Sequence, residues 1–383
     1  MTQPAVRLTE WAGPGGASAA WPSALVEGLA SGLARHRPPG VDIVVGLSPV
    51  DDAAVIRLPD EVASLLGVGL VSTIDGFPPM VDDPHDYGAI VTAHACGNVL
   101  AMGARVLAGQ AIVAFPVELG AEVVAAVCEG VADTLFAAGG ALVGGHTVRS
   151  GEPILGVAVQ GIVAAGEART RDGAQPGDVL VISKRVGTGL VLAGGTADDR
   201  RRAVASMCTV SRAAAQSLAR WGDRVHALTD VGSSSLVGAA WSLARGSGYR
   251  VAIDLEMVPA YRGALAAAEA GSRAVGADGN AEFLAPHVTF ERPDLPAAAA
   301  AAAGTGTREP APGSNAAFSE VAHEALVFDP QTAGGLLAAL DPQLASAAVD
   351  AGFVVIGEVG SALPGVTLLS SLSPTPPRGY QHG

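Results

Sequence analysis

The sequence predicts an α/β protein with two domains, each built from a sheet and its own helices. The chain has 383 residues, of which 49% are hydrophobic and only 16% charged, so it can bury a large core and is not disordered throughout. Short apolar runs typical of strands alternate with longer runs that have helical spacing. The alternation starts again after a Gly/Pro turn at residues 175–178, which indicates a domain boundary.

The first domain is predicted over residues 42–168. Its strands are expected at 41–47, 53–58, 68–77 and 104–116, and its helices at 86–104 and 121–140. Small residues along 86–104 allow close packing, and Gly139 suits a helix C-terminal cap. Two strands joined by a turn are expected within 141–166. A flexible loop and a short helix at 23–36 are expected in residues 1–41.

The second domain is predicted over residues 176–369. Helices are expected at 201–221 and 234–248, and strands at 179–184, 226–231, 249–255, 324–330, 335–340 and 353–359. Residues 293–316 are rich in Ala, Pro and Gly and predict a surface loop within this domain. Residues 370–383 are predicted to form a disordered tail.

Charge and hydropathy exclude several classes of function. The chain has 23 basic and 37 acidic residues, a net charge of −14, and no basic cluster longer than Arg200–Arg202, so we expect no nucleic-acid partner. No apolar run is long enough to span a membrane, and the start lacks the pattern of a secretory signal. A cytoplasmic protein is therefore expected. Its three widely spaced cysteines predict neither a disulfide framework nor a zinc site.

Four groups of Asp, Gly and hydroxyl residues stand near the ends of predicted strands. They are Asp51-Asp52, the stretch 72–83 with Thr73 and Asp75, the loop Gly144-Gly145-His146-Thr147, and Thr229-Asp230 with the distant segment 329–335. Taken singly, each is typical of an ordinary turn. Together they suit a metal–phosphate site, because carboxylates hold hard cations and glycines let backbone N–H groups reach phosphate oxygens. Lys184 is the only lysine, so lysines cannot neutralise a polyanion.

In their order along the chain, these motifs resemble the selenophosphate synthetase (selenide, water dikinase) family. The resemblance covers about residues 42–360 and rests on DDAAVI, STIDGF with VDDPHDYGAIV, LAMGAR, GGHTV, GDVLVISKRVGTGL, LTDV and DPQTAGGLL. It implies the two-domain fold of the aminoimidazole-ribonucleotide-synthetase-like superfamily. It also implies a homodimer in which the N-terminal sheets pair into a barrel, with ATP held by Mg²⁺. The family transfers the γ-phosphoryl group of ATP to hydrogen selenide and forms selenophosphate, AMP and orthophosphate.

The resemblance also implies roles for individual residues. Asp52, Asp230 and the residue at position 98 match metal ligands. Nucleotide contacts are expected from Thr73, Asp75, Gly144, Gly145, His146, Thr147 and Lys184.

The chain departs from the family pattern at two places. The N-terminal loop of the family carries a Cys and a following Lys, whereas this chain has glycine near that Cys position, at Gly16, and alanine near the Lys position, at Ala19. Ser18 is then the only nucleophilic side chain in the loop, and a hydroxyl needs an activating base to act. On the helix after the second motif, Asn98 replaces a metal-binding Asp. His94 replaces an Asn, and either a softer metal or a plain structural role can explain it.

Two functions remain open from these residues. The first is ATP- and Mg²⁺-dependent phosphoryl transfer, with selenide or another small nucleophile as the acceptor. The second is a catalytically inactive relative that binds nucleotide or acts as a structural or regulatory partner. A hydrogenase-maturation activity is disfavoured, because it requires a C-terminal Cys and this chain ends in Gln381-His382-Gly383.

Overall fold

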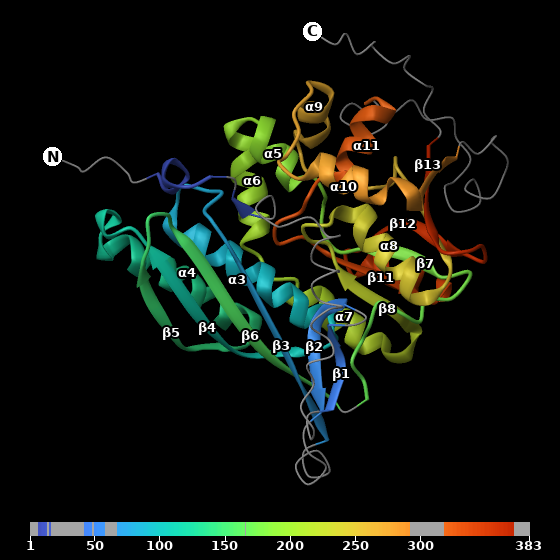
Figure 1. The fold of residues 1–383 in the computed structure, drawn as a ribbon. Helices are drawn as coiled ribbons and strands as arrows, with labels where there is room; N and C mark the ends of the chain where they lie inside the picture. Colours follow the sequence, from blue (N-terminus) through green and yellow to red (C-terminus); the bar gives the residue numbers. More distant parts are fainter. Residues whose placement is uncertain are drawn as a thin grey trace.

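The computed structural model describes residues 7–13, 15–16, 42–47, 50–57, 67–164, 166–291 and 318–370, and it confirms an α/β protein with two sheets (Figure 1). One sheet has six strands and comes from the N-terminal half, and the other has seven and comes from the C-terminal half. Ser18, Ala19, the predicted helix at 23–36, the loop at 293–316 and residues 371–383 lie outside the described residues. No described helix is both long and apolar enough to cross a membrane.

The N-terminal sheet has the strand order β1-β2-β3-β6-β4-β5, in which only β4 and β5 are parallel. Its strands are β1 (Asp42–Leu47), β2 (Val50–Arg57), β3 (Val68–Phe77), β4 (Arg105–Phe115), β5 (Ala141–Arg149) and β6 (Ile154–Ala164). Two helices, α3 (Pro84–Ala101) and α4 (Ala121–Ala138), accompany it, and η1 (Leu8–Trp11) and η3 (Val117–Leu119) are single 3₁₀ turns.

Glycines let α3 and α4 approach closely on one face of the N-terminal sheet. A Cβ added to Gly88 would lie 2.1 Å from the carbonyl oxygen of Val127, and one added to Gly130 would lie 2.1 Å from that of His85. Only glycine fits at such a backbone crossing. The opposite face of the sheet carries exposed apolar side chains, including Ile74 and Ile112. One face is therefore a packed core and the other is open.

The C-terminal sheet is mixed and has the order β10-β13-β9-β12-β7-β11-β8. Its strands are β7 (Val179–Ile182), β8 (Val225–Asp230), β9 (Arg250–Asp254), β10 (Val288–Glu291), β11 (Leu336–Leu340), β12 (Val354–Gly360) and β13 (Gly365–Leu369). The helices are α5 (Thr188–Gly194), α6 (Ala197–Met207), α7 (Arg212–Trp221), α8 (Ser235–Ser247), α9 (Ala264–Glu269), α10 (Ala277–Leu284), α11 (Glu320–Phe328) and α12 (Ala345–Asp350). Short 3₁₀ turns are η4 (Gly222–Arg224), η5 (Ala285–His287) and η8 (Pro342–Leu344).

Two predictions of local structure were wrong. The segment 324–330 was predicted as a strand, but residues 324–328 form the second half of α11 and the helix ends at Phe328. The first turn of α11 is capped by the Ser319 side chain, which accepts from the N–H of Ala322. The segment 201–221 was predicted as one helix but forms two, because α6 ends at Met207 and α7 starts only at Arg212. Apolar runs of this length do not distinguish a buried strand from a buried helix.

The first residues of β2 and the helix α3 lie against the C-terminal domain. Both contact β8, and α3 also contacts α6 and α7. The ends of β2, β3 and β8 and the middle of α3 therefore meet between the two domains. The predicted domain limits stay a prediction, with β6 ending at Ala164 and β7 beginning at Val179.

Candidate functional site between the two domains

Three of the predicted site residues form a hydrogen-bonded group on β3 and α3. The amide Nδ2 of Asn98 donates to Oδ2 of Asp75 at 2.6 Å and to Oγ1 of Thr73 at 3.1 Å. Thr73 and Asp75 alternate with the exposed Ile74 on the strand, so both point to the face that α3 covers. Asn98 thus meets them as a donor through its nitrogen. The metal-ligand role expected of its carbonyl oxygen stays a prediction.

His94 lies one helical turn before Asn98 and faces the same carboxylate. Its Nδ1 accepts the backbone N–H of Ala333 at 3.0 Å, and its Nε2 is 3.9 Å from Oδ1 of Asp75. In the neutral ring the proton is therefore on Nε2 and points toward Asp75. A ring in this tautomer has no free lone pair for a metal, so the geometry favours the structural role for His94.

A second group surrounds Asp52 at the start of β2. Its Oδ1 accepts from the Thr229 hydroxyl at 3.1 Å, and its Oδ2 accepts from the backbone N–H of Asp230 at 3.2 Å. The Arg171 guanidinium forms a close ion pair with the same Oδ1. Arg171 also lies 3.3 Å from Asp51, Nε to Oδ1, and its Nε donates to the Thr229 hydroxyl. The Asp52 carboxylate is thus surrounded by donors from two distant segments.

Burial and like charge shape the acid–base properties of this group. Burial, reinforced by the charge of Asp52, raises the pKa of Asp230 well above its usual range. Burial and the charge of Asp52 also raise the pKa of Asp51 to about 6, against the opposing effect of Arg171. Burial disfavours the charge of Arg171, but Asp52 and Asp51 outweigh it and raise the pKa of the guanidinium. A raised pKa means that the nearby positive charge does not fully stabilise the ionised carboxylate, so an additional cation would be favourable there.

The two groups differ in how well they fit a magnesium ion. Mg²⁺ takes oxygen ligands in tight octahedral geometry, and carboxylates are its usual protein ligands. Asp75 is 28% exposed on its side chain and accepts from the neutral amide of Asn98, and Arg171 is the cation that acts on the half-buried Asp230. Both fit a divalent cation. Asp52 is 1% exposed on its side chain and already accepts from Arg171, Thr229 and Asp230, so it does not fit in this arrangement.

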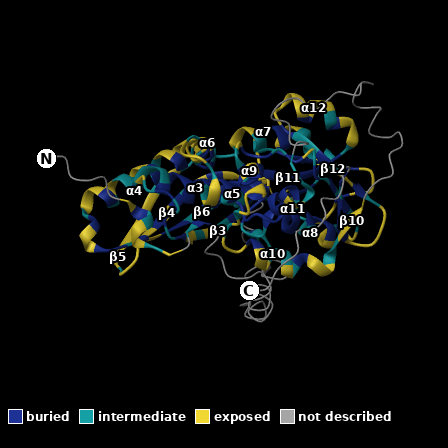
Figure 2. Ribbon diagram, turned by 90° about the horizontal axis from the view of Figure 1, so that it is seen from above, coloured by how far each residue is buried: buried dark blue, intermediate teal, exposed yellow. Residues whose placement is uncertain are grey.

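The predicted phosphate loop lies far across the N-terminal sheet from these carboxylates. Gly144, Gly145, His146 and Thr147 belong to the edge strand β5, which β6 and β4 separate from β3. All four are exposed, and β5 lies at the end of the molecule in Figure 2. The structure therefore does not bring this loop together with Thr73 and Asp75 within one chain.

Lys184 joins two segments of the interface. Its Nζ donates to the carbonyl oxygens of Ser206 at 3.1 Å, Thr209 at 2.5 Å and Ala333 at 3.0 Å. Burial lowers its pKa to about 8. Ala333 has a left-handed backbone (φ 49°) and is held through its N–H by His94 and through its carbonyl by Lys184. The nucleotide contact expected of Lys184 stays a prediction, and its visible role is to fasten this strained loop.

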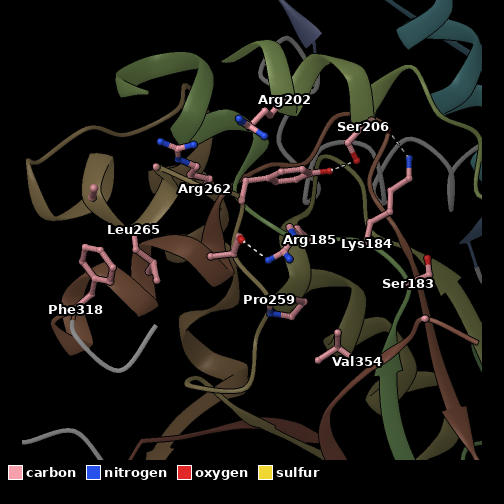
Figure 3. Close-up of a pocket in the computed structure, with 15 residues that line it drawn as sticks. Ser183, Lys184, Arg185, Arg202, Ser206, Pro259, Arg262, Leu265, Phe318 and Val354 are labelled. Atoms are coloured by element: carbon pink, nitrogen blue, oxygen red, sulfur yellow. Dashed lines mark hydrogen bonds between the residues drawn. The ribbon is translucent and has the colours of Figure 1, made fainter. Parts of the chain in front are cut away.

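A cavity of about 820 Å³ opens beside Lys184 in the C-terminal domain (Figure 3). Arginines line it, but each has a partner within the protein. Arg202 and Arg262 bind Asp198, and Arg185 donates to the carbonyl oxygen of Ala260. The hydroxyl groups of Tyr261 and Ser206, which also line the cavity, are hydrogen-bonded to each other at 2.8 Å. The cavity is basic, yet a ligand would compete with existing contacts.

The segment 329–335 has a structural role at the interface, because its side chains hydrogen-bond to the backbone at the start of α5. Oε1 of Gln331 accepts the backbone N–H groups of Gly187 and Thr188 at 2.9 and 3.1 Å, at the start of α5. The buried Asp329 accepts the N–H of Gly189 at 2.9 Å, and burial raises its pKa to about 7. A carboxylate at a helix N-terminus compensates the dipole and the unpaired N–H groups there.

The segment that replaces the family's Cys position is packed against the same interface. Gly16 is buried with a left-handed backbone (φ 63°), and its N–H donates to the carbonyl oxygen of Pro78 at 3.3 Å. A Cβ at this position would lie 2.8 Å from Oγ1 of Thr332 and 3.2 Å from Cε of Met80. Neither the space nor the backbone suits a side chain at position 16 in this arrangement.

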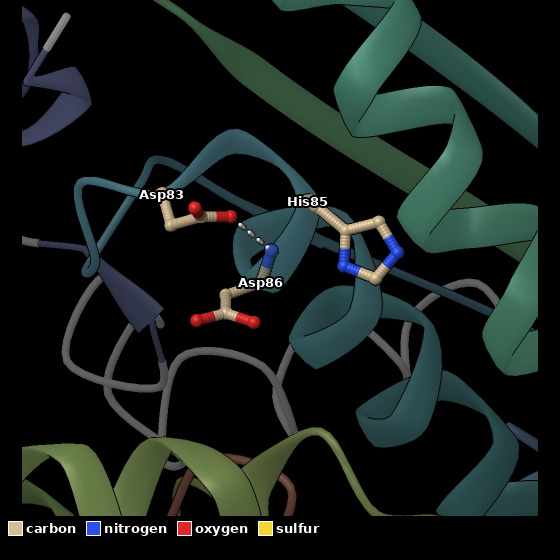
Figure 4. Close-up of side chains that lie close together, drawn as sticks. All are labelled: Asp83, His85 and Asp86. Atoms are coloured by element: carbon tan, nitrogen blue, oxygen red, sulfur yellow. Dashed lines mark hydrogen bonds between the residues drawn. The ribbon is translucent and has the colours of Figure 1, made fainter. Parts of the chain in front are cut away.

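Asp83, His85 and Asp86 form a compact acidic group at the start of α3 (Figure 4), the one such cluster with metal-ligand spacing among the described residues. Its contacts are those of a helix start. Oδ1 of Asp83 accepts the N–H of Asp86 at 2.9 Å as the N-terminal cap, and His85 pairs with Asp133 on α4. These residues are explained by the helix.

Sequence reasoning missed the most important cation of the site. Arg171 stands in the stretch between the two sheets, 119 positions from Asp52, and no local motif distinguishes it from the other arginines. The Asp51-Asp52 pair was the one usable signal, because two adjacent carboxylates that become buried require a nearby positive charge.

Comparisons with known proteins support one family over nearly the whole chain. Residues 50–163 match the family model "AIR synthase related protein, N-terminal domain". The chain is 33% identical to the selenide, water dikinase of Myxococcus xanthus (strain DK1622) over 376 residues, covering 95% of this chain and 97% of that protein. It is 34% identical to the selenide, water dikinase of Pelobacter propionicus over 375 residues, covering 94% and 97%.

Solved structures share the fold at low sequence identity. The thiamine-monophosphate kinase of Stenotrophomonas maltophilia K279a superposes with a TM-score of 0.57 at 19% identity, covering 89% of this chain and 94% of that chain. The hydrogenase maturation protein HypE in complex with ATP gives a TM-score of 0.54 at 18% identity, covering 85% and 87%. Together with the family model, these structures confirm the predicted two-domain fold.

Proposed function

This chain belongs to the selenide, water dikinase family, and on that premise we propose that it binds ATP and transfers a phosphoryl group from it to a small nucleophile. The observation that carries the proposal is the meeting of Thr73, Asp75 and Asp230 between the two domains, in the company of Asn98. The names of the two relatives specify selenide, and a structural neighbour was solved with ATP. Selenide is therefore the first acceptor to test.

Each side chain has a definite part in the proposal. Asp75 and Asp230 would hold Mg²⁺, which neutralises charge on the phosphates when bound. Asn98 orients Asp75 by donating to Oδ2, and the Nε2–H of His94 faces the other oxygen. Because phosphoryl transfer depends mostly on positioning and charge stabilisation, a site that holds its groups rigidly needs no covalent nucleophile on the protein. The absence of a side chain at Gly16 is compatible with such a reaction.

A homodimer is the second part of the proposal. Ile74, Leu107, Ile112 and Ile154 expose apolar surface on the N-terminal sheet, at 68%, 47%, 45% and 41% of their residue areas. Exposed apolar patches on a folded protein mark interaction surfaces. A second copy of the chain would cover this surface, as in the barrel that the family resemblance implies. Such a dimer would also supply Gly144–Thr147 of one copy to the site of the other.

A catalytically inactive relative is the competing function. Gly16 leaves no thiol at the position where the family has one, and Asp52 is occupied by Arg171. A protein of this kind would bind ATP without turnover, or would act as a structural or regulatory partner without binding it.

Phosphorus-31 NMR separates the two functions. We expect ATP with Mg²⁺ and protein to yield AMP and orthophosphate only when selenide is added, with sulfide as the comparison acceptor. Calorimetric titration of ATP with Mg²⁺ gives the binding arm of the test. Binding without selenide-dependent breakdown would establish an inactive nucleotide-binding relative. No binding at millimolar ATP would refute the enzyme and favour a structural or regulatory partner.

A further inference from the structure

We infer that Arg171 serves as a built-in cation at Asp51 and Asp52, so that the protein holds one divalent ion fewer than its set of carboxylates could recruit. The inference concerns the metal content of the proposed site and therefore rests on the proposed function. As described above, the Asp52 carboxylate does not fit a magnesium ion in this arrangement. Arg171 is the residue responsible for this poor fit.

The geometry places a single guanidinium on both carboxylates. Arg171 pairs with Oδ1 of Asp52 and lies 3.3 Å from Oδ1 of Asp51, while its backbone N–H donates to Oδ2 of Asp51 at 3.3 Å. The two carboxylates are 1% and 8% exposed on their side chains, and that of Arg171 is 20% exposed. Arginine stays charged under all ordinary conditions and offers a fork of N–H groups that matches carboxylate oxygens. Its position is thus that of a permanent counter-ion.

The same contacts exclude a metal from Asp52. Oδ1 accepts from Arg171 and Thr229, and Oδ2 accepts from the N–H of Asp230. A divalent ion bound there would have to displace donors from both carboxylate oxygens and repel a guanidinium. Two positive groups within a few ångströms of each other in a buried site are strongly unfavourable. Asp52 therefore binds Arg171 in place of a divalent ion.

Arg171 also links the two domains through this pairing. It lies in the stretch between β6 and β7, its Nε donates to Thr229 on β8, and its carboxylate partners are on β2. Replacing it with a neutral residue of similar length leaves Asp51 and Asp52 without a positive charge. A divalent ion is the simplest replacement, because two adjacent carboxylates are suitable ligands for it.

Mn²⁺ provides the probe, with bound ions counted by electron paramagnetic resonance in protein free of nucleotide. We expect Arg171→Gln to bind one more Mn²⁺ than the wild type, and its melting temperature to rise with Mg²⁺ more than that of the wild type. Arg171→Lys keeps the charge and should bind as the wild type does. Arg169→Gln is the matched control, because Arg169 lies two positions away and its carboxylate partner, Asp223, is exposed and outside the cluster.

Two results would overturn the inference. One is an equal Mn²⁺ count and equal affinity in the wild type and in a cooperatively folded Arg171→Gln. The other uses Asp52→Asn in the wild-type background, which should leave the Mn²⁺ count unchanged, so the loss of an ion would show that Asp52 is a metal ligand. Neither measurement includes ATP or an acceptor. The inference about Arg171 can therefore be refuted in a protein that turns over ATP, and it can be supported in a protein that does not.

Discussion

The predicted site has two halves that differ in their exposure to solvent. The acidic half lies between the domains, and the glycine-rich half lies on the edge strand β5. Asp52 of the N-terminal domain has a buried side chain paired with donors, and Asp230 of the C-terminal domain donates its backbone N–H to that carboxylate. Gly144–Thr147 are exposed at the far edge of the N-terminal sheet (Figures 1 and 2). One chain folds its acidic half-site completely, whereas its glycine-rich half-site faces solvent.

In the proposed dimer, only the glycine-rich half would depend on a second copy of the chain. Charges that leave water need partners from the same fold, so the acidic cluster is fixed as soon as the domains dock. A glycine-rich edge strand has no such requirement and remains available for another surface. The experiments below test this contrast, starting with the change of largest expected effect.

Asp75→Ala should remove most of the affinity for Mg²⁺-ATP. The carboxylate is the most accessible of the cluster and provides one of the two charges proposed for the metal, so we expect binding about a hundredfold weaker. Calorimetric titration measures this. Asp133→Ala is the control, because Asp133 is an exposed aspartate on α4 that pairs only with His85 among the described contacts. Unchanged affinity in Asp75→Ala would place the nucleotide elsewhere.

Ile112→Asp should separate the dimer and with it the two halves of the site. Ile112 lies opposite His146 in the β4–β5 register and is exposed on the open face, where a charge would be buried against a second copy. Light scattering should change from dimer to monomer, and ATP affinity should fall about tenfold. Val349→Asp, at an exposed apolar position on α12, should change neither. A wild type that is monomeric at micromolar concentration would contradict this prediction.

Asn98→Asp should raise the affinity for Mg²⁺ and make the fold depend on it. The new carboxylate would face Oδ2 of Asp75 where the amide donates at 2.6 Å, so without a cation the two charges repel. We expect a lower melting temperature without Mg²⁺ and roughly tenfold tighter Mg²⁺ binding. Asn98→Ala removes the donor without adding charge and should not gain affinity. Equal Mg²⁺ affinity in Asn98→Asp and the wild type would exclude position 98 from the metal shell.

Asp329, which lies outside the carboxylate cluster, should make the free energy of unfolding depend on pH. Burial raises its pKa to about 7, so between about pH 4 and 7 the folded state keeps a proton that the unfolded state has lost. The free energy of unfolding should therefore fall as pH rises through this window, by at most about 1.4 kcal/mol per pH unit from this group. Urea unfolding from pH 4 to 8 measures the slope. Asp329→Asn should lack this contribution, and an identical slope in both proteins would contradict the raised pKa.

The sequence by itself determined the fold class, most of the elements and the family. The strand predicted at 68–77 coincides with β3, because its apolar alternation is bounded by glycine and proline on either side. The helix at 121–138 follows from helical spacing and from Gly139, which takes the left-handed conformation at its end. Such features depend on neighbours a few positions apart. The motifs around Thr73, Asp75 and Asp230 could likewise be recognised from residue order alone.

Only the tertiary structure decided how those residues are engaged. Arg171 meets Asp52 across 119 positions, and Asp230 meets it across 178, so no local pattern records either contact. The helix at 320–328 replaced a predicted strand because its buried side chains pack against other helices of the C-terminal domain. The distance of β5 from Asp75 is set by the strand order, which places β6 and β4 between them. The pairing of charges and the order of strands are properties of the whole fold. A charge needs a partner, and a strand needs a neighbour, only once distant segments are buried together.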